Sequence, residues 1–152
     1  MSIVAKEKDG GRMNVPIKLI GNGKAPVYKS AGASCLDCYA RLDDTEVILP
    51  KERARIPLGF AMELPEGYEA VIRPRSGMTS AGVDTAIGTI DSDYRGEVCA
   101  CLINNSTIRA IVKNGDRVCQ MKIQRAEVIT IVVTDELTDT ERGSNGFGST
   151  GR

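Results

Sequence analysis

Short runs of alternating apolar and polar residues, each ended by turn-forming residues, make up most of the chain. This two-residue period is that of a half-buried β-strand, and hardly any stretch carries the period of an amphipathic helix. We expect about ten short strands, the first over residues 15–20 and the last over residues 127–133. Such a pattern indicates an all-β sandwich. The 152 residues suffice for one such domain, which we expect over residues 14–137.

The turn residues also predict which strands pair. Turns containing proline or glycine, at residues 50–53 and 65–67, each separate two strand patterns, and Asn114-Gly115 suits the type I′ turn of a tight hairpin. The predicted pairs are residues 46–50 with 54–58, 61–64 with 68–73, and 108–113 with 117–123. Residues 98–103 form a continuous apolar run, which predicts a strand covered on one face by the sandwich interior and on the other by a neighbouring subunit.

Residues 88–98 (GTIDSDYRGEV) carry more polar chemistry than an ordinary loop. Two aspartates, a tyrosine and an arginine lie between two glycines and two apolar runs, so Ile90 and Val98 would anchor the segment and hold Asp91 in place. The same spacing fits a β-hairpin in which the aspartate and the tyrosine only satisfy turn hydrogen bonds. The segment alone leaves both interpretations open.

Residues 73–82 (RPRSGMTSAG) interrupt the strand pattern. Pro74 favours an extended residue before it, and Ser76 is a suitable N-cap for a short helical turn. Its hydroxyl and the N–H groups that follow could face an anion, to which Arg75 would add a fork suited to phosphate oxygens. The alternative is a capped turn beside solvated arginines.

Residues 138–152 (TDTERGSNGFGSTGR) form a polar tail with four glycines, which we expect to be mobile. The tail nevertheless contains Arg142 and Phe147, one of only two phenylalanines in the chain. It is either a disordered end with an incidental aromatic residue, or a lid whose arginine meets an anion and whose ring stacks on a flat ligand.

Asp37 lies among apolar neighbours in a strand pattern, flanked by Cys35 and Cys38. Burying an unpaired carboxylate is costly, so a cation, a metal-bound water or a shell of hydrogen bonds is expected beside it. The C-x-x-C spacing could serve metal or redox chemistry. The chain has no histidine and an odd number of cysteines, five, which favours free buried thiols in a reducing compartment.

The net charge is zero, with 20 basic and 20 acidic residues, which argues against a nucleic-acid or anionic membrane surface as partner. No apolar stretch is long enough to span a bilayer. Residues 1–13 lack the apolar centre of a secretory signal and are expected to form a flexible extension. The expected protein is soluble and cytoplasmic, or inside a host cell if it is viral.

Five separated stretches, taken together and in this order, resemble the all-β dUTPases. They are GASCLDCYA (residues 32–40), PRSGM (residues 74–78), GTIDSDYRGEV (residues 88–98), GDRVCQ (residues 115–120) and RGSNGFGSTG (residues 142–151). The resemblance implies a jelly-roll sandwich, a homotrimer with active sites at subunit boundaries, and a mobile C-terminal arm. It also implies Mg²⁺-dependent hydrolysis of dUTP to dUMP and pyrophosphate by attack of water on the α-phosphate. That reaction would keep dUTP out of DNA and supply dUMP for thymidylate synthesis.

The resemblance further assigns roles to the nucleoside end of the substrate. Asp91 would be the base that activates water. The ring of Tyr94 would lie against the deoxyribose and leave no space for a 2′-hydroxyl. Uracil would be read by backbone groups of a hairpin over residues 85–90, whose contact residues would be Gly88, Thr89 and Ile90. No asparagine lies over residues 84–88 to add a side-chain contact, so a contact from Thr85 stays open.

The remaining implied roles concern the phosphates, the metal and the tail. Asp37 would hold Mg²⁺ through water, and Arg117 would brace the trimer or the hairpin. Phosphate oxygens would be bound by Arg75, Ser76, Gly77 and, from another subunit, Gln120. In the tail, Arg142 would reach the γ-phosphate and Phe147, followed by Gly148, would close over uracil. Two alternatives on the same fold are a dCTP deaminase, which would need a further acid near the pyrimidine C4, and a non-catalytic nucleotide-binding regulator.

Overall fold

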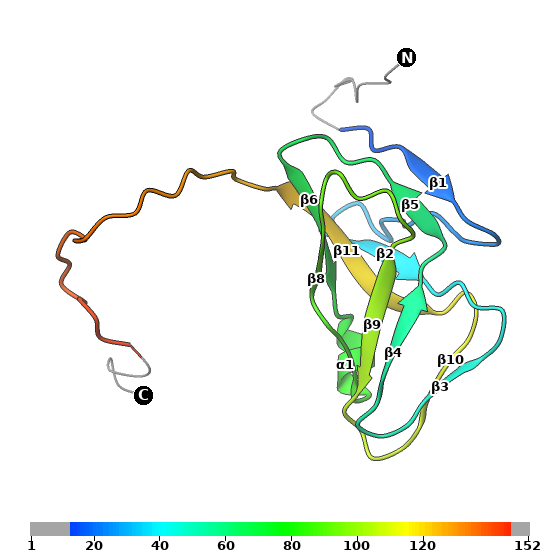
Figure 1. Ribbon diagram of the computed structural model, residues 1–152. Helices are drawn as coiled ribbons and strands as arrows, with labels where there is room; N and C mark the ends of the chain where they lie inside the picture. The colour runs from blue at the N-terminus through cyan, green and yellow to red at the C-terminus, as the bar shows by residue number, and fades with distance from the viewer. Residues whose placement is uncertain (1–12, 147–152) are drawn as a thin grey trace.

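Eleven strands and one short helix occur in residues 13–146, the part of the chain that the computed structural model describes (Figure 1). The all-β expectation is confirmed. The elements are β1 (Ile17–Leu19), β2 (Leu36–Tyr39), β3 (Glu46–Ile48), β4 (Arg53–Pro57), β5 (Phe60–Met62), β6 (Tyr68–Arg73), α1 (Ser76–Ser80), β7 (Val83–Thr85), β8 (Gly88–Ile90), β9 (Cys99–Asn104), β10 (Ala110–Val112) and β11 (Arg117–Arg125).

Two larger sheets enclose the core. One has the strand order β2-β11-β6-β8 and the other the order β4-β9-β7, and all their pairs are antiparallel. Each sheet contributes alternate residues to a single buried cluster, which includes Ile72 and Met121 from the first sheet and Ile56 and Leu102 from the second. Burial of each such side chain contributes about 1.5–3 kcal/mol. Two shorter ribbons, β1-β5 and β10-β3, complete the body.

The predicted strand pairs are wrong, although most of the strands exist. β3 pairs with β10 and β4 with β9, while β5 pairs with β1 and β6 lies between β11 and β8. The turn at Asn114-Gly115 does form, with Gly115 at φ 84° and a 3.1 Å bond from the Asp116 amide to the Lys113 carbonyl. However, β10 and β11 leave this turn into different sheets. Alternation fixes which face a residue occupies, but it does not identify the partner strand.

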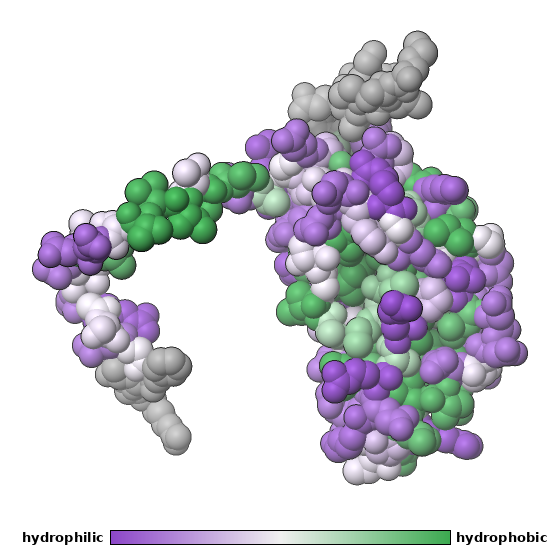
Figure 2. Space-filling model, viewed as in Figure 1, coloured by the Kyte–Doolittle hydropathy of each residue, from purple (hydrophilic) through white to green (hydrophobic). Residues whose placement is uncertain are grey.

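The strand predicted over residues 127–133 is also absent. β11 ends at Arg125, and the following segment runs away from the body without regular structure (Figure 1). We call residues 126–137 the apolar arm, because it carries several nearly fully exposed apolar side chains, visible as the green stretch outside the body (Figure 2). They are Val128, Ile129, Ile131, Val132, Val133 and Leu137. The sequence here favours a strand, but this single chain gives it no strand to pair with.

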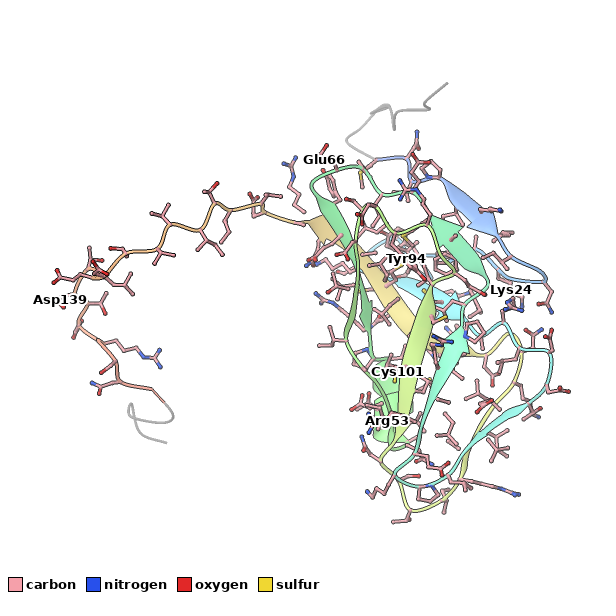
Figure 3. The ribbon with its side chains drawn as sticks, in the orientation of Figure 1. Lys24, Arg53, Glu66, Tyr94, Cys101 and Asp139 are labelled. Carbon is pink, nitrogen blue, oxygen red and sulfur yellow. The ribbon has the colours of Figure 1, made fainter. Side chains whose placement is uncertain are left out.

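The apolar run over residues 98–103 packs against the sandwich interior on one face, as the sequence predicts, while coverage of the other face by a neighbouring subunit stays a prediction. Ala100, Leu102 and Asn104 are buried, whereas Cys99 and Cys101 are partly exposed on the outer face. Figure 3 labels Cys101 on β9, on the same side of the body as Tyr94. Within residues 13–146 there is no helix of the length and apolarity that crossing a membrane requires.

Candidate active site

The segment over residues 88–98 crosses from one sheet to the other. β8 pairs with β6 and β9 pairs with β4 and β7, so the hairpin interpretation of this segment is wrong. Ile90 and Val98 are buried, as the sequence predicts, and they hold the two ends of the loop. Asp91 is exposed at the turn that follows β8, where its carbonyl accepts a 3.2 Å hydrogen bond from the Tyr94 amide.

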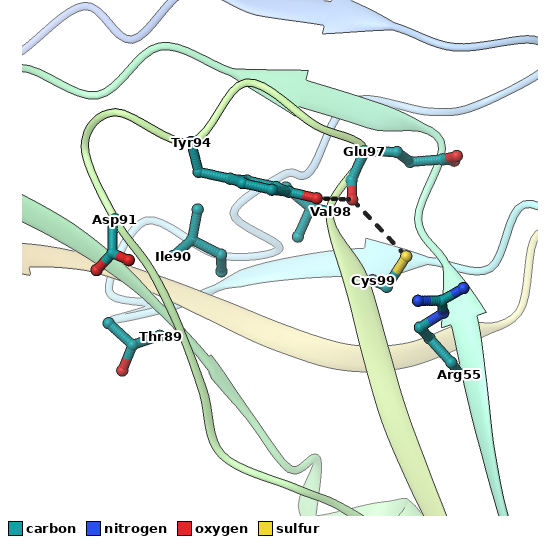
Figure 4. Close-up of a pocket in the computed structure, with 8 residues that line it drawn as sticks. All are labelled: Arg55, Thr89, Ile90, Asp91, Tyr94, Glu97, Val98 and Cys99. Atoms are coloured by element: carbon teal, nitrogen blue, oxygen red, sulfur yellow. Dashed lines mark hydrogen bonds between the residues drawn. The ribbon is translucent and has the colours of Figure 1, made fainter.

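This loop borders a cavity of about 270 Å³ (Figure 4). Its lining residues are Arg55, Thr89, Ile90, Asp91, Tyr94, Glu97, Val98 and Cys99. The Tyr94 hydroxyl donates a 3.1 Å hydrogen bond to the Glu97 carbonyl, and the Cys99 thiol approaches the same oxygen at 3.7 Å. A carboxylate and an aromatic ring thus border one small space, which suits a flat or ring-shaped ligand beside a proton acceptor.

Glu97 also forms an ion pair that the sequence did not predict. Its two carboxylate oxygens accept hydrogen bonds from Arg41 Nε at 2.9 Å and Arg41 Nη2 at 3.1 Å, and Oε1 accepts a third from the Gly59 amide at 3.0 Å. The bonds from Arg41 hold the pKa of the Glu97 carboxyl below its ordinary value, against the opposing effect of burial. No local spacing connects residues 41 and 97, so only the fold reveals the pair.

The corner over residues 85–90 is not a hairpin, because β7 and β8 belong to different sheets. Gly88 is half-buried and Thr89 is exposed, so both can be approached from outside. Thr85 is buried, and its hydroxyl donates a 3.3 Å hydrogen bond to the Val118 carbonyl. The Thr85 side chain therefore makes a buried hydrogen bond and is not exposed at the corner.

A second group of predicted residues gathers around Asp37. Arg117 Nη1 donates a 2.9 Å hydrogen bond to Asp37 Oδ2, and Arg75 Nε lies 3.6 Å from Oδ1. Arg75 Nη1 also donates to the main-chain carbonyl of Arg117 at 2.6 Å. The expectation that this acid requires a charged or hydrogen-bonding partner is therefore met by two arginines. The sequence did not predict that Arg117 contacts Asp37 directly.

Neighbouring strands bring Gln120 into the same group. Asp37 on β2, Gln120 on β11 and Arg73 on β6 are directly opposite one another in register. Gln120 Nε2 donates a 2.8 Å hydrogen bond to the Pro74 carbonyl, which places the amide beside the start of α1. Two guanidinium groups thus contact one carboxylate, with an amide on the neighbouring strand, an arrangement with excess positive charge that suits an anion.

The short helix forms where the sequence predicts it, but its cap differs. The residue at the N-cap position is Arg75, with no side-chain capping bond, and Ser76 is the first helical residue. The Met78 amide donates a 3.0 Å hydrogen bond to the Arg75 carbonyl, whereas the N–H groups of Ser76 and Gly77 precede the first helical bond and belong to exposed residues. Arg75 has extended backbone angles, φ −101° and ψ 131°, and its carbonyl accepts the first bonds of the helix, so it and not Ser76 occupies the N-cap position.

The two groups lie far apart in one chain. Continuing the register across the four-stranded sheet places Asp37 in the row of Arg73, whereas Asp91 falls in the row of Glu69. A strand rises about 3.3 Å per residue and neighbouring strands lie about 4.8 Å apart, so Asp37 and Asp91 are separated by about 20 Å. The two groups therefore cannot contact one phosphorus atom from a single chain.

The donor set at Asp37 fits a metal ion held through water. Over residues 13–146 there is no group of three or more acidic, cysteine or histidine side chains that could cage a metal. Mg²⁺ does not need such a cage, because it keeps several waters and commonly binds one carboxylate together with substrate phosphates. Asp37 Oδ1 has only the longer contact to Arg75, so it is the oxygen better able to accept a bond from a metal-bound water.

The remaining predicted residues belong to the tail. Arg142 is exposed, and its Nε donates a 2.8 Å hydrogen bond to the Asn145 carbonyl. In Figure 3, Asp139, at the start of the tail, lies far from Tyr94 on the body. Phe147 and Gly148 lie outside the described residues. A single chain thus does not bring Arg142 to either group.

The cysteines are all free. Cys38 and Cys119 are buried, as predicted, and the other three are partly buried. Cys38 and Cys119 lie opposite each other on β2 and β11. A hydrogen bond between these two thiols, together with burial, raises the pKa of Cys38 far above its ordinary value.

Comparison with known proteins identifies relatives that match most of the chain, including the site residues up to the tail. A family model described as dUTPase matches residues 21–151. A deoxyuridine 5'-triphosphate nucleotidohydrolase of Hydrogenobaculum sp. (strain Y04AAS1) is 46% identical over 137 residues, which cover 88% of this chain and 94% of the relative. A protein of the same name from Neorickettsia sennetsu (strain ATCC VR-367 / Miyayama) is 43% identical over 141 residues, which cover 89% and 95%.

Solved structures show the same fold. The Staphylococcus bacteriophage 80alpha dUTPase with dUPNHPP has a TM-score of 0.81 at 24% identity, and the match covers 91% of this chain and 99% of that one. A mutant dUTPase from phage phi11 of S. aureus, described as coordinating a structural Mg(II) ion, has a TM-score of 0.76 at 19% identity. That match covers 83% of this chain and 99% of the phage protein.

Proposed function

The chain belongs to the dUTPase family and hydrolyses dUTP to dUMP and pyrophosphate, and we propose how its residues divide this work. One observation carries the proposal. Thr89, Ile90 and Tyr94, three of the residues expected to bind the base and sugar, border one cavity, and those expected to bind phosphates form a separate group with excess positive charge. A nucleoside triphosphate has its base and sugar at one end and a polyanion at the other, so the two groups match its two ends.

The two groups would meet across a subunit boundary in a homotrimer. Their separation of about 20 Å within one chain supports this arrangement. The cavity, at about 270 Å³, lies just below the range of about 300–1,000 Å³ typical of ligand pockets, so it would take only part of a triphosphate. The exposed apolar arm is a surface of the kind that another protein chain covers. A ring of identical contacts would complete every site in the same way.

Asp91 would accept a proton from the attacking water. The water oxygen would form a bond to the α-phosphorus while the bond from that phosphorus to the bridging oxygen breaks. Pyrophosphate would leave with the electron pair, and Asp91 would return the proton to solvent. A positioned general base contributes about 10²–10⁴-fold to such a step. The buried side chains of Ile90 and Val98 support this role because they fix the loop that carries Asp91.

Arg75, Ser76, Gly77 and Gln120 would bind the phosphates. Arg75 is already held by its bonds to Arg117 and Asp37, so little side-chain freedom would be lost when an anion binds. The N–H groups of the exposed residues Ser76 and Gly77 would bind phosphate oxygens. The Ser76 hydroxyl would lie near the bridging oxygen as negative charge develops on the leaving pyrophosphate.

We infer that Mg²⁺ is the metal and that Asp37 would hold it through water. When bound, the ion would neutralise phosphate charge and so favour departure of pyrophosphate. The longer contact at Asp37 Oδ1, 3.6 Å to Arg75, supports this mode of binding, because that oxygen is the better able to accept a further bond. The Mg(II) ion attributed to the phage phi11 enzyme is described as structural, so it gives only general support.

Tyr94 would lie against the deoxyribose and exclude a 2′-hydroxyl, while backbone groups of Gly88, Thr89 and Ile90 would read uracil. The tail would then close the site, with Arg142 on the γ-phosphate and Phe147, next to Gly148, over the base. No observation favours a deaminase or a non-catalytic regulator. The reaction would keep dUTP out of DNA and supply dUMP for thymidylate synthesis. The five free thiols support a cytoplasmic location.

The test is release of pyrophosphate from dUTP, UTP and dTTP by the wild type and by Asp91→Asn. We expect the wild type to use dUTP strongly and the other two poorly, and Asp91→Asn to lose at least about 100-fold in kcat, as removal of a general base should. Asp93→Asn is the matched control, because it removes a carboxylate two residues away on the same exposed loop. Equal turnover by wild type and Asp91→Asn would refute the proposed base.

A further inference from the structure

The pair formed by Arg41 and Glu97 is more rigid than an ordinary surface salt bridge. It is a two-pronged contact, with 2.9 and 3.1 Å hydrogen bonds, and both side chains are only 22% exposed. Fork-to-fork contacts of this kind fix orientation as well as distance. Arg41 lies outside the five stretches that resemble the family, so its role does not follow from them.

The arginine stem lies in a slot made by two backbone turns. Gly21 and Gly59 have φ values of 55° and 74°, and a Cβ added to Gly59 would lie 3.0 Å from Arg41 Cβ and 3.3 Å from Arg41 Cδ. A Cβ added to Gly21 would lie 3.6 Å from Arg41 Cδ. The Arg41 amide also donates a 2.8 Å hydrogen bond to the Pro57 carbonyl. The stem is therefore held on both sides, and the guanidinium has little freedom to move.

Glu97 passes this rigidity to Tyr94. The carboxylate of Glu97 is fixed by Arg41 and by the Gly59 amide, while its main-chain carbonyl accepts the Tyr94 hydroxyl at 3.1 Å (Figure 4). The Tyr94 ring also lies so close to Gly96 that a Cβ added to residue 96 would overlap the phenol. The ring of Tyr94 is thus located by the position of the Glu97 peptide and by the absence of a side chain at residue 96.

We propose that Arg41 and Glu97 are positioning residues that hold the Tyr94 ring where it excludes a ribose 2′-hydroxyl, and so set the preference for deoxyribonucleotides. This inference rests on the role proposed for Tyr94. The Tyr94 ring would reject the 2′-hydroxyl by steric exclusion. A small displacement of the ring would therefore admit UTP, while dUTP would still fit. Discrimination of this kind is a difference between two transition states, which a positioning contact can change separately from overall activity.

A purely structural role predicts a different result. If the pair only stabilised the fold, its loss would lower the fraction of active enzyme and reduce turnover of dUTP and UTP by the same factor. The deciding quantity is therefore the ratio of kcat/KM for dUTP to kcat/KM for UTP. This ratio does not depend on the concentration of active sites.

The experiment measures this ratio for the wild type, Arg41→Gln, Glu97→Gln, Tyr94→Phe and the double variant Arg41→Gln with Tyr94→Phe. We expect each single substitution to lower the ratio about tenfold, within the coupling range of residues in contact, chiefly through increased use of UTP. The double variant should fall little further than either single variant, because both changes remove the same restraint. Arg41→Lys, which keeps the charge without the fork, carries the test if Arg41→Gln does not fold.

Glu63→Gln is the matched control. Glu63 pairs with Arg95, which lies on the loop that carries Tyr94, but the two are 3.9 Å apart and both side chains are about half exposed. Loss of this pair should therefore leave the ratio unchanged. A constant ratio in Arg41→Gln, Arg41→Lys and Glu97→Gln, alongside a reduced ratio in Tyr94→Phe, would overturn the inference and leave the proposed function intact. A wild type that takes UTP as readily as dUTP would instead refute the role proposed for Tyr94 itself.

Discussion

Arg117 Nη1 lies 2.9 Å from Asp37 Oδ2, and the same arginine accepts the Arg75 guanidinium on its main-chain carbonyl at 2.6 Å. Arg117 therefore orients a carboxylate through its side chain and a second arginine through its backbone. Arg117 and Asp37 lie on the adjacent strands β11 and β2, so the sheet holds the two side chains near each other. The charged group around Asp37 is thus arranged before any ligand arrives.

We predict that Arg117→Gln weakens the binding of Mg²⁺ and of the substrate phosphates, with a smaller effect on the stability of the fold. Without the 2.9 Å bond the Asp37 carboxylate can rotate, so the Mg²⁺ concentration for half-maximal activity should rise several-fold and kcat/KM for dUTP should fall about tenfold. The measurement is dUTP turnover as a function of Mg²⁺ concentration. Arg125→Gln removes an arginine from the end of the same strand and should leave the curve unchanged. An unaltered curve for Arg117→Gln would contradict the positioning of Asp37.

A second prediction concerns the pH dependence of stability. Arg41 holds the pKa of Glu97 below its ordinary value of 4.5, so the folded state binds this proton less readily than the unfolded state. The stabilisation is therefore present above pH 4.5 and is lost as the pH falls through the lowered pKa of the folded protein. Between pH 7 and pH 4.5 the difference in unfolding free energy between wild type and Glu97→Gln should be constant, and it should shrink below pH 4.5.

Urea unfolding at several pH values and one fixed protein concentration measures this difference. The Glu63→Gln variant, whose carboxylate is about half exposed, serves as reference and should show no comparable change. A difference between wild type and Glu97→Gln that persists unchanged far below pH 4.5 would show that the carboxylate charge is not the stabilising feature.

Particular residues show what the sequence could and could not reveal. The alternation of apolar residues identified the β-class and the anchors Ile90 and Val98, because burial on one face of a strand is a local property. The partners of β3, β4 and β5 escaped prediction, because pairing between distant strands depends on the whole topology. The contact between Arg41 and Glu97 escaped for the same reason. The roles taken from family motifs named residues, but they gave no indication of the slot that holds Arg41.

A third prediction concerns thiol reactivity. A hydrogen bond to Cys119 and burial both raise the pKa of Cys38, and the thiolate is the reactive form. Native protein treated with iodoacetamide at pH 8 should therefore be labelled much more slowly at Cys38 than at the partly exposed Cys35. Both should react at similar rates in urea. Peptide mapping by mass spectrometry measures the two rates, and equally fast labelling in the native protein would contradict the buried thiol pair.

The last prediction separates the apolar arm from the tail beyond it. Exposed fractions of 90% at Val128 and 92% at Val133 mean that the single chain covers neither side chain, and burying both against a neighbouring subunit would favour association. Ile131→Asp should therefore weaken the oligomer, measured as the concentration at which it dissociates in analytical ultracentrifugation. Thr130→Asp adds the same charge at the adjacent polar position and should weaken the oligomer less.

Removal of residues 142–152 should leave association unchanged and abolish turnover, because Arg142 and Phe147 would be lost while the arm remains. Dissociation of this truncated protein, or its full activity, would contradict the proposed separation of roles.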